Sequence, residues 1–338
     1  MIREAIATLV AGRSLTRADA AAAMVEIMAG EATPAQIAVF ALILHQKGET
    51  IDELAGLASV MRENSLHVET PYDVVDTCGT GGDGAGTFSI STTAAFVVAG
   101  AGVRVAKHGN RAMSSRTGSA DVLQALGVKI DLGPTGVARC IDAAGIGFMF
   151  AQAFHPGMRH AAAPRREIGV RTVFNVLGPL TNPAGARRQI VGVGDRSLVG
   201  PIAGALAQLG ATHALVVHGT DGVDEMSIGA PTVVAEARSG TVSEYSISPE
   251  DLGIGRSPIS TIAGGDSEVN ARLSRSVLAG EAGPCRDAVV LNAGAALYVA
   301  GVAPTIADGV TLARQAIDSG AAARSLDALV RVSNEPNA

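Results

Sequence analysis

The feature that most constrains the fold of this chain is a change of pattern at Pro71. Residues 1–66 contain only helical signals, whereas short apolar strands and helices alternate after Pro71. Such alternation predicts a mainly parallel sheet with helical crossovers, because parallel strands need long connections. The 338 residues are too many for one compact core, so we expect two domains of unequal size.

Local signals mark the helices of the first part of the chain. Thr33 and Pro34 are an N-cap and first-turn pair ahead of a long apolar run. Thr50 and Glu53 have the spacing of a capping box before the next helix. Residues 156–182 are again helical in pattern and interrupt the later alternation. We therefore expect a small helical domain.

The second part of the chain predicts five strands. The helices expected between them begin at Ser91 and Ser119, and the tail from Asn270 is mostly helical in pattern. The predicted strands are 73–76, 103–106, 146–150, 189–193 and 214–218.

Composition excludes several classes of protein. The formal charge of −6 argues against a general nucleic-acid binder. The three cysteines are widely spaced and form no CxxC pair, which argues against a disulfide framework or a zinc cluster. The same pattern favours a location in the reducing cytoplasm. The most apolar stretch, residues 288–303, is too short for a membrane span and contains Asn292. We expect a soluble protein with no membrane partner.

A dense glycine loop, DTCGTGGDG at residues 76–84, follows the first predicted strand. Glycines at such a position let backbone N–H groups converge on a phosphate. Gly79, Gly81 and Gly84 also match the dinucleotide-binding spacing. That interpretation needs a helix opening at the third glycine, but the predicted helix begins only at Ser91. The pattern therefore favours another phosphate ligand.

Hydroxyl and basic side chains follow this loop. The segment 87–92 places several hydroxyls at the start of a helix, where Ser91 is either a plain N-cap or part of an anion site. Asp83 is either a turn residue or a ligand-binding one. Lys107 and Arg111 follow the second strand and suit a phosphate or pyrophosphate, with a solvated basic loop as the alternative.

Adjacent carboxylates at Asp224 and Glu225 follow a predicted strand and turn. Such a pair suits Mg²⁺, which prefers oxygen ligands and phosphate co-ligands, but it needs an irregular loop to share one ion. His155 and Arg165, taken singly, suit structural roles better than ligand binding. The Gly-Pro and Asn-Pro turns at residues 178–183 indicate a rigid wall beside a cleft.

Taken together and in this order, these segments make the sequence similar to the anthranilate phosphoribosyltransferase family. The similarity covers essentially the whole chain, and its motifs are GTGGDG, FSIST, KHGNR followed by SS and GSADVLQALG, RREIGVRTVFNVLGPLTNP, and DGVDE. It implies an α-helical domain of residues 1–70 and 156–182, used for dimerisation and anthranilate binding. It also implies a larger α/β domain of residues 71–155 and 183–338, with a mainly parallel sheet, which holds the donor and magnesium.

The resemblance implies a glycosyltransferase of the pentosyltransferase class. Its members transfer the 5-phosphoribosyl group of phosphoribosyl pyrophosphate (PRPP) to the amine of anthranilate, giving N-(5-phosphoribosyl)anthranilate and pyrophosphate in tryptophan biosynthesis. It further implies Mg²⁺, a homodimer and a cytoplasmic location. An aromatic amine is neutral at pH 7, so we expect positioning and leaving-group stabilisation without an acid–base dyad.

The resemblance also assigns residues to each part of the site. Positioning and electrostatic roles in catalysis fall to Lys107, His108, Asn110 and Arg165. Magnesium would be held by Ser91, Asp224 and Glu225. Anthranilate would contact Gly79, His108, Asn110, His155, Arg165, Gly178 and Pro179. The donor would contact Gly79, Gly82, Asp83, Thr87, Ser89, Ile90, Ser91, Thr92, Lys107, His108, Gly109, Asn110, Arg111, Ser114, Ser115 and Ser119.

Three positions depart from the family pattern. Ser89 replaces a common Asn, Phe154 replaces a frequent His or Tyr, and Ala163-Pro164 stands where relatives usually have Pro-Val. These changes bear on affinity and acceptor selectivity more than on reaction type. The alternatives are a phosphoribosyltransferase for another aromatic amine, a pyrimidine-nucleoside phosphorylase, and a non-catalytic relative that binds nucleic acid or a regulatory partner. The negative charge and the intact carboxylates disfavour the last.

Overall fold

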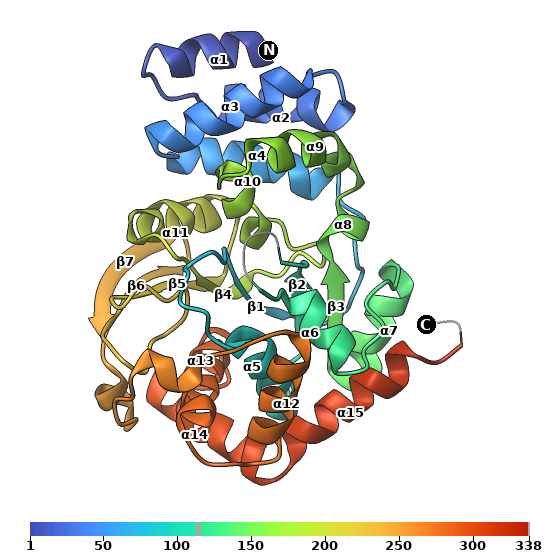
Figure 1. Ribbon diagram of the computed structural model, residues 1–338, viewed down its shortest axis with the longest axis vertical. Coiled ribbons are helices and arrows are strands. Elements are labelled where there is room, and N and C mark those ends of the chain that lie inside the picture. The colour runs from blue at the N-terminus through green and yellow to red at the C-terminus, as the bar shows by residue number, and fades with distance from the viewer. Residues whose placement is uncertain (113–115, 337–338) are drawn as a thin grey trace.

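The computed structural model describes residues 1–112 and 116–336. Ser114 and Ser115, which are predicted to contact the donor, lie outside the described residues. In Figure 1 a layer of helices lies above a sheet whose lower face is covered by further helices. The upper layer begins with α1 (Ile2–Val10), α2 (Arg17–Ala29), α3 (Pro34–Lys47) and α4 (Ile51–Glu63).

The predicted helix starts in this layer are confirmed. Thr33 is the N-cap of α3, its side chain accepts from the Gln36 N–H, and Pro34 is the first helical residue. Thr50 and Glu53 form the predicted capping box at the start of α4. Each cap satisfies backbone N–H groups that have no partner within the helix.

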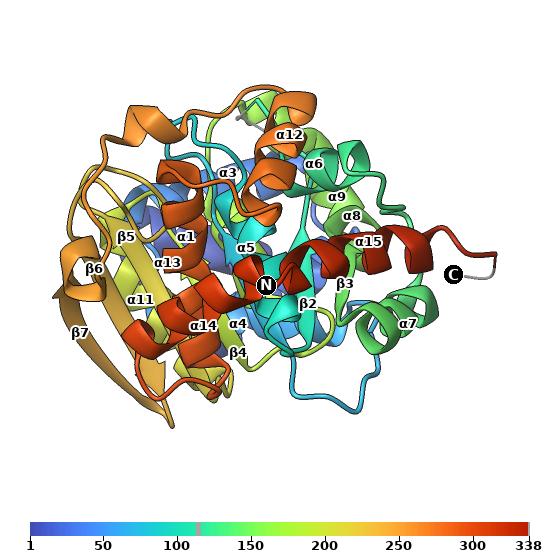
Figure 2. The same ribbon diagram turned by 90° about the horizontal axis from the view of Figure 1, so that it is seen from below.

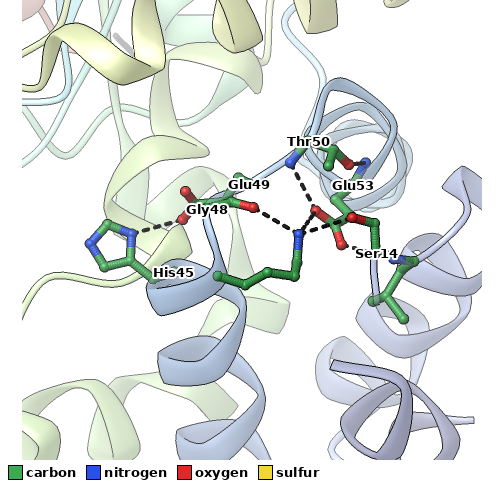
Figure 3. A network of polar contacts seen from close by, with 8 residues as sticks. Ser14, His45, Gly48, Glu49, Thr50 and Glu53 are labelled. Carbon is green, nitrogen blue, oxygen red and sulfur yellow. Dashed lines mark hydrogen bonds and ion pairs between the residues drawn. The ribbon is translucent and has the colours of Figure 1, made fainter. Parts of the chain in front are cut away.

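The buried carboxylate of Glu53 joins three of these segments (Figure 3). It accepts hydrogen bonds from the backbone N–H groups of Leu15 and Thr50, each at 2.8 Å. The Lys47 ammonium lies 2.9 Å from the same carboxylate. A buried charge is tolerated only when it is paired and hydrogen-bonded, so this network fixes the end of α3 and the start of α4 against the α1–α2 loop.

The sheet has seven strands in the order β3-β2-β1-β4-β5-β6-β7. The first five are parallel, and β6 and β7 run antiparallel at one edge. This confirms the predicted mainly parallel sheet. The strands are β1 (Val75–Gly79), β2 (Val105–Gly109), β3 (Ile146–Phe150), β4 (Arg188–Gly192), β5 (His213–Gly219), β6 (Thr232–Arg238) and β7 (Thr241–Ile247).

Two parts of the strand prediction are wrong. The β6–β7 hairpin was not predicted, although Gly240 between the two strands has the positive φ of a tight turn. The predicted strands 73–76 and 103–106 both lie too early in the chain, since β1 is Val75–Gly79 and β2 is Val105–Gly109. Lys107, predicted to follow the second strand, is instead buried inside β2.

Helices cover both faces of the sheet. Segment 156–182 is mostly helical, as predicted, and α9 within it packs on α2 and α3. Helices α13, α14 and α15 lie nearest the viewer in Figure 2, below the sheet. The helices after β1 are α5 (Ile90–Gly100), α6 (Ser119–Ala125), α7 (Pro134–Ala144), α8 (Ala151–Phe154), α9 (Arg159–Ile168), α10 (Val173–Val176), α11 (Val199–Gln208), α12 (Ser267–Leu278), α13 (Pro284–Val299), α14 (Ile306–Asp318) and α15 (Ala321–Ser333). Short 3-10 helices span Pro156–Met158, Gly178–Leu180, Arg196–Leu198, Pro249–Leu252 and Ile259–Ile262.

Two apolar cores lie on opposite faces of the sheet. One contains Phe96 of α5 and Leu297 of α13. The other contains Phe40 of α3, Ile202 of α11 and Val216 of β5. The upper helices therefore share a core with the sheet rather than standing apart from it. Among the described residues, no helix is long and apolar enough to cross a membrane.

Candidate active site

Three of the predicted ligand segments follow the carboxyl ends of parallel strands. They are the glycine loop after β1, Asn110 and Arg111 after β2, and the loop with Asp224 and Glu225 after β5. Strands β1 and β4 are neighbours, but the chain continues from β1 toward β2 and from β4 toward β5. Open α/β sheets bind ligands at such a switch point, outside the strand ends. The Thr80 N–H donates to the Gly192 carbonyl at 2.9 Å, so the loops after β1 and β4 touch there.

The glycine loop after β1 has the backbone that its sequence predicts. Gly81, Gly82, Gly84 and Gly86 all have positive φ, from +62° to +75°. Helix α5 begins only at Ile90, well past the third glycine of the dinucleotide spacing. A dinucleotide site would place the helix start at that glycine, so the geometry disfavours this alternative.

The loop after β5 packs directly on two strand ends. A Cβ added at Gly192 would lie 1.5 Å from the Asp224 carbonyl oxygen, and one at Gly79 would lie 2.9 Å from Asp224 Oδ2. Both positions therefore need glycine for close backbone approach. The sequence pattern singled out Gly79 but not Gly192, because this contact joins segments far apart in the chain.

The two adjacent carboxylates point to different loops. Asp224 Oδ2 accepts from the Gly81 N–H at 2.8 Å. Glu225 Oε1 accepts from the Ser91 N–H at 3.1 Å, in the first turn of α5. The predicted irregular loop is therefore present, and it brings both carboxylates and Ser91 to the switch point. Their role as metal ligands stays a prediction.

The surroundings of both carboxyl groups disfavour their charged form. Burial raises the pKa of Asp224 well above its usual range, and the neighbouring Asp83 and Glu225 charges raise it further. Burial also raises the pKa of Glu225 to about 8, although the Lys107 ammonium opposes that rise. A bound cation would favour the charged form of both groups.

The donor atoms at this point fit magnesium bound together with a phosphate. All are oxygens, and Mg²⁺ is commonly held by one or two carboxylates plus substrate phosphates and water. Within residues 1–112 and 116–336, no group of three or more His, Cys, Asp or Glu side chains is arranged to hold a metal alone. A phosphate ligand would have to supply the remaining oxygens.

A buried amide from α13 holds the residue after the carboxylate pair. Asn292 Oδ1 accepts from the Met226 N–H at 2.9 Å, and Asn292 Nδ2 donates to the Met226 carbonyl at 3.1 Å and to the Ala288 carbonyl at 2.9 Å. The amide is thus satisfied inside an apolar helix. In the sequence, Asn292 was only a polar residue in an apolar stretch.

Lys107 and Asp76 are buried side chains of opposite charge on the neighbouring strands β2 and β1, beneath the loops. Lys107 is 2% exposed, and its ammonium donates to the Thr77 carbonyl. Asp76 accepts from the His108 N–H at 3.2 Å and from Asn182 Nδ2 at 2.7 Å. Burial lowers the pKa of Lys107 and raises that of Asp76, and the opposite charges counter both shifts. Lys107 also lowers the pKa of Glu225, one of the two adjacent carboxylates, from inside the protein.

Two buried histidines lie side by side at the acceptor side of the predicted site. The rings of His108 and His155 are 5.1 Å apart. Burial lowers the pKa of His108 to about 3 and that of His155 to about 4, so both are neutral at pH 7. His108 Nδ1 lies 3.2 Å from the Gly178 carbonyl, while its Nε2 has no hydrogen-bond partner among the described residues. This geometry brings the 178–180 turn to the end of β2.

The remaining predicted site residues differ in what their side chains contact. Arg165 is half-buried on α9, with its guanidinium 5.6 Å from the Phe174 ring centre. Ser119 Oγ donates to the Asn110 carbonyl at 3.4 Å, next to the end of β2. Arg111 instead donates to Asp121 on α6 at 2.6 Å. The side chains that turn into the protein rather than toward the loops are the buried Ile90 and Thr92 of α5.

The three departures from the family pattern have local structural settings. Ser89 is the N-cap of α5 but makes no side-chain cap bond. Phe154 is buried in the core below the sheet. Pro164 lies inside α9, where proline removes one helical hydrogen bond.

Comparisons with known proteins agree with this geometry. Residues 71–323 match the model of the glycosyl transferase family a/b domain, and residues 3–65 match the helical bundle domain of that family. The anthranilate phosphoribosyltransferase of Chloroflexus aggregans is 58% identical, over 98% of each chain. That of Symbiobacterium thermophilum is 60% identical, over 94% of this chain and 93% of the relative.

Solved structures agree as well. Anthranilate phosphoribosyltransferase from Thermus thermophilus superposes with a TM-score of 0.92 at 45% identity, over 98% of this chain and 99% of that chain. The Saccharomyces cerevisiae enzyme in complex with PRPP and Mg gives a TM-score of 0.89 at 26% identity, over 98% of this chain and 97% of that chain. The chain therefore belongs to the anthranilate phosphoribosyltransferase family, the glycosyltransferases that move the phosphoribosyl group of PRPP onto anthranilate in tryptophan biosynthesis.

Proposed function

We propose that this chain joins PRPP to anthranilate at the switch point between β1 and β4, with magnesium held beside the pyrophosphate. The observation that carries the proposal is the placement of the Asp224 and Glu225 carboxylates. They reach the glycine loop and the first turn of α5, where phosphate and metal are needed together. The complex of the yeast relative with PRPP and Mg supports the same pairing.

The donor would lie along the glycine loop and the start of α5. Backbone N–H groups and the positive end of a helix favour an anion there. The proposed donor contacts from the described residues are Gly79, Gly82, Asp83, Thr87, Ser89, Ile90, Ser91, Thr92, Lys107, His108, Gly109, Asn110, Arg111 and Ser119. The inward-turned Ile90 and Thr92 would act through backbone atoms, and Arg111 would have to leave Asp121 to reach a phosphate.

Ser91, Asp224 and Glu225 would hold magnesium. When bound there, the ion supplies positive charge to the departing pyrophosphate. The protein's own contribution is to fix the carboxylates by the N–H groups of Gly81 and Ser91 before any ligand arrives. Such preorganised charge is usually the largest single contribution to catalysis.

Anthranilate would approach from the side of α9 and the 178–180 turn. Arg165 would hold its carboxylate, and Asn110 would orient its amine toward the ribose carbon. The neutral rings of His108 and His155, together with Gly178 and Pro179, would line its path and exclude water. The amine is neutral at pH 7, so orientation rather than proton removal governs attack.

The finer assignments are also proposals. We place the helical domain at residues 1–70 and 156–182, and the α/β domain at 71–155 and 183–338. We further propose a cytoplasmic homodimer that associates through the helical domain. Large apolar side chains are exposed on its helices, which supports an interface there. They are Val10, Val25, Val39 and Leu42.

The direct test follows anthranilate fluorescence after PRPP and magnesium are added to the full-length protein. We expect a magnesium-dependent loss of fluorescence with one pyrophosphate released per anthranilate consumed. A magnesium-free reaction is the control. Folded protein that leaves the fluorescence unchanged would reject anthranilate as the acceptor.

Arg165→Ala should raise the anthranilate KM by about 10- to 100-fold and leave the PRPP KM near its wild-type value, since a hydrogen bond to a charged group contributes about 1.5–3 kcal/mol. The measurement is steady-state kinetics with each substrate varied in turn. Arg166→Ala, at an exposed neighbour on α9, is the matched control. Equal increases in both KM values would argue against a carboxylate clamp.

A further inference from the structure

Arg171 reaches the glycine loop from the acceptor side of the site. It lies in the short connection between α9 and α10, a little beyond Arg165 in the chain. Its Nη2 donates to the Thr80 carbonyl at 3.0 Å. The segment proposed to hold anthranilate is therefore bonded directly to the loop proposed to hold PRPP.

The contact with Gly82 is closer still. A Cβ added at Gly82 would lie 1.8 Å from Arg171 Nη1 and 2.6 Å from Arg171 Cζ. Gly82 also has a φ of +75°, where side chains are strained. The Arg171 guanidinium thus packs against the loop at Gly82, where the Cβ of any other residue would collide with it.

Charge complements this contact. Arg171 is half-buried, and burial lowers its pKa, while the carboxylates of Asp224 and Asp83 raise it. Lys107 acts on Glu225 from inside the sheet, whereas Arg171 acts on Asp83 and Asp224 from the helical side. The two cations therefore come from different elements, Lys107 from β2 and Arg171 from the connection between α9 and α10.

We propose that Arg171 is a positioning residue that holds the glycine loop in its donor-binding shape from the acceptor side. Its planar guanidinium can bond the Thr80 carbonyl while lying against Gly82, which a lysine ammonium cannot reproduce. For PRPP as the ligand of this loop, the inference rests on the function proposed above. For the shape of the loop, it rests on the contacts of Arg171 alone.

The test compares Arg171→Ala and Arg171→Lys with Arg166→Ala, an exposed arginine of the same segment. Hydrogen exchange is measured first, without any substrate, on peptides that cover residues 79–86. The N–H groups of Thr80, Gly81 and Ala85 are hydrogen-bonded in this loop and report its shape. We expect them to exchange about tenfold faster in Arg171→Ala, as loss of a charge-assisted bond allows, and at the wild-type rate in Arg166→Ala.

Kinetics then separate positioning from general stability. Arg171→Ala should raise the PRPP KM about tenfold or more and change kcat at saturating PRPP by much less. Arg171→Lys should recover only part of this loss. A change in kcat with an unaltered PRPP KM would overturn the proposal, because the loop would then bind PRPP equally well without the arginine.

The exchange experiment tests the role of Arg171 independently of turnover with PRPP and anthranilate. If wild-type protein fails to turn over PRPP and anthranilate, the proposed function falls, and the exchange experiment still decides the role of Arg171. Unchanged exchange at residues 79–86 in both Arg171 variants would overturn that role. If Arg171→Ala does not fold, Arg171→Lys decides by the same two measurements.

Discussion

Replacing Asp224 by Asn and Glu225 by Gln together is expected to lower turnover by about 10³-fold or more, since losing one preorganised electrostatic group already costs 10²–10³. The amides keep the shape of the carboxylates but lose the negative charge that a magnesium ion needs. The fold should persist, and its melting temperature should not fall, because burial already disfavours the charged form of both carboxyl groups. Pyrophosphate release and thermal melting are the measurements.

A matched control for this variant removes two carboxylates elsewhere. Glu63→Gln with Asp327→Asn makes the same chemical change at exposed positions on α4 and α15. That protein should retain wild-type turnover. If the Asp224 and Glu225 variant keeps turnover within several-fold of wild type, the metal assignment is wrong.

Lys107→Met is expected to destabilise the protein by about 1–3 kcal/mol, the usual cost of leaving a buried acceptor without its donor, because the Thr77 carbonyl loses the ammonium. The change leaves Asp76 buried without its opposite charge and takes the ammonium away from Glu225. Urea unfolding followed by circular dichroism measures the free energy of unfolding. Lys129→Met, at an exposed lysine, should change that free energy by no more than about 0.5 kcal/mol.

A second substitution identifies the partner of Lys107. Adding Asp76→Asn to Lys107→Met removes the unpaired charge, so the double variant should recover part of the lost stability. The amide can still accept from the His108 N–H. Simple addition of the two single effects would show that Asp76 and Lys107 are not energetically coupled.

Much of the site was predictable because its residues follow strands. Gly79 ends β1, His108 and Gly109 end β2, and Asp224 lies in the loop after β5. Parallel strands bring such loops to one edge, so a correct strand pattern already groups them. The grouping survived the errors in the strand bounds, because those errors did not change which loop follows which strand.

Contacts between distant side chains were not predictable in the same way. Nothing local marks Arg171 as the neighbour of Gly82 or Asn292 as the partner of Met226. Arg111 likewise pairs with Asp121 on the next helix, a contact that the sequence spacing did not indicate, and its role toward the donor stays a prediction. A charged side chain takes the nearest partner that the fold offers, and sequence spacing does not reveal it.

The hydrogen bonds between Asn292 and Met226 join the loop that carries the carboxylate pair to a helix that is synthesised later. Synthesis runs from the N-terminus, so all proposed magnesium and donor ligands leave the ribosome before α13 does. A nascent chain that ends before residue 292 has these side chains but lacks the amide that fixes the backbone beside them. We therefore expect the backbone beside the carboxylate pair to be held in place only after α13 has been synthesised and packed beneath the sheet.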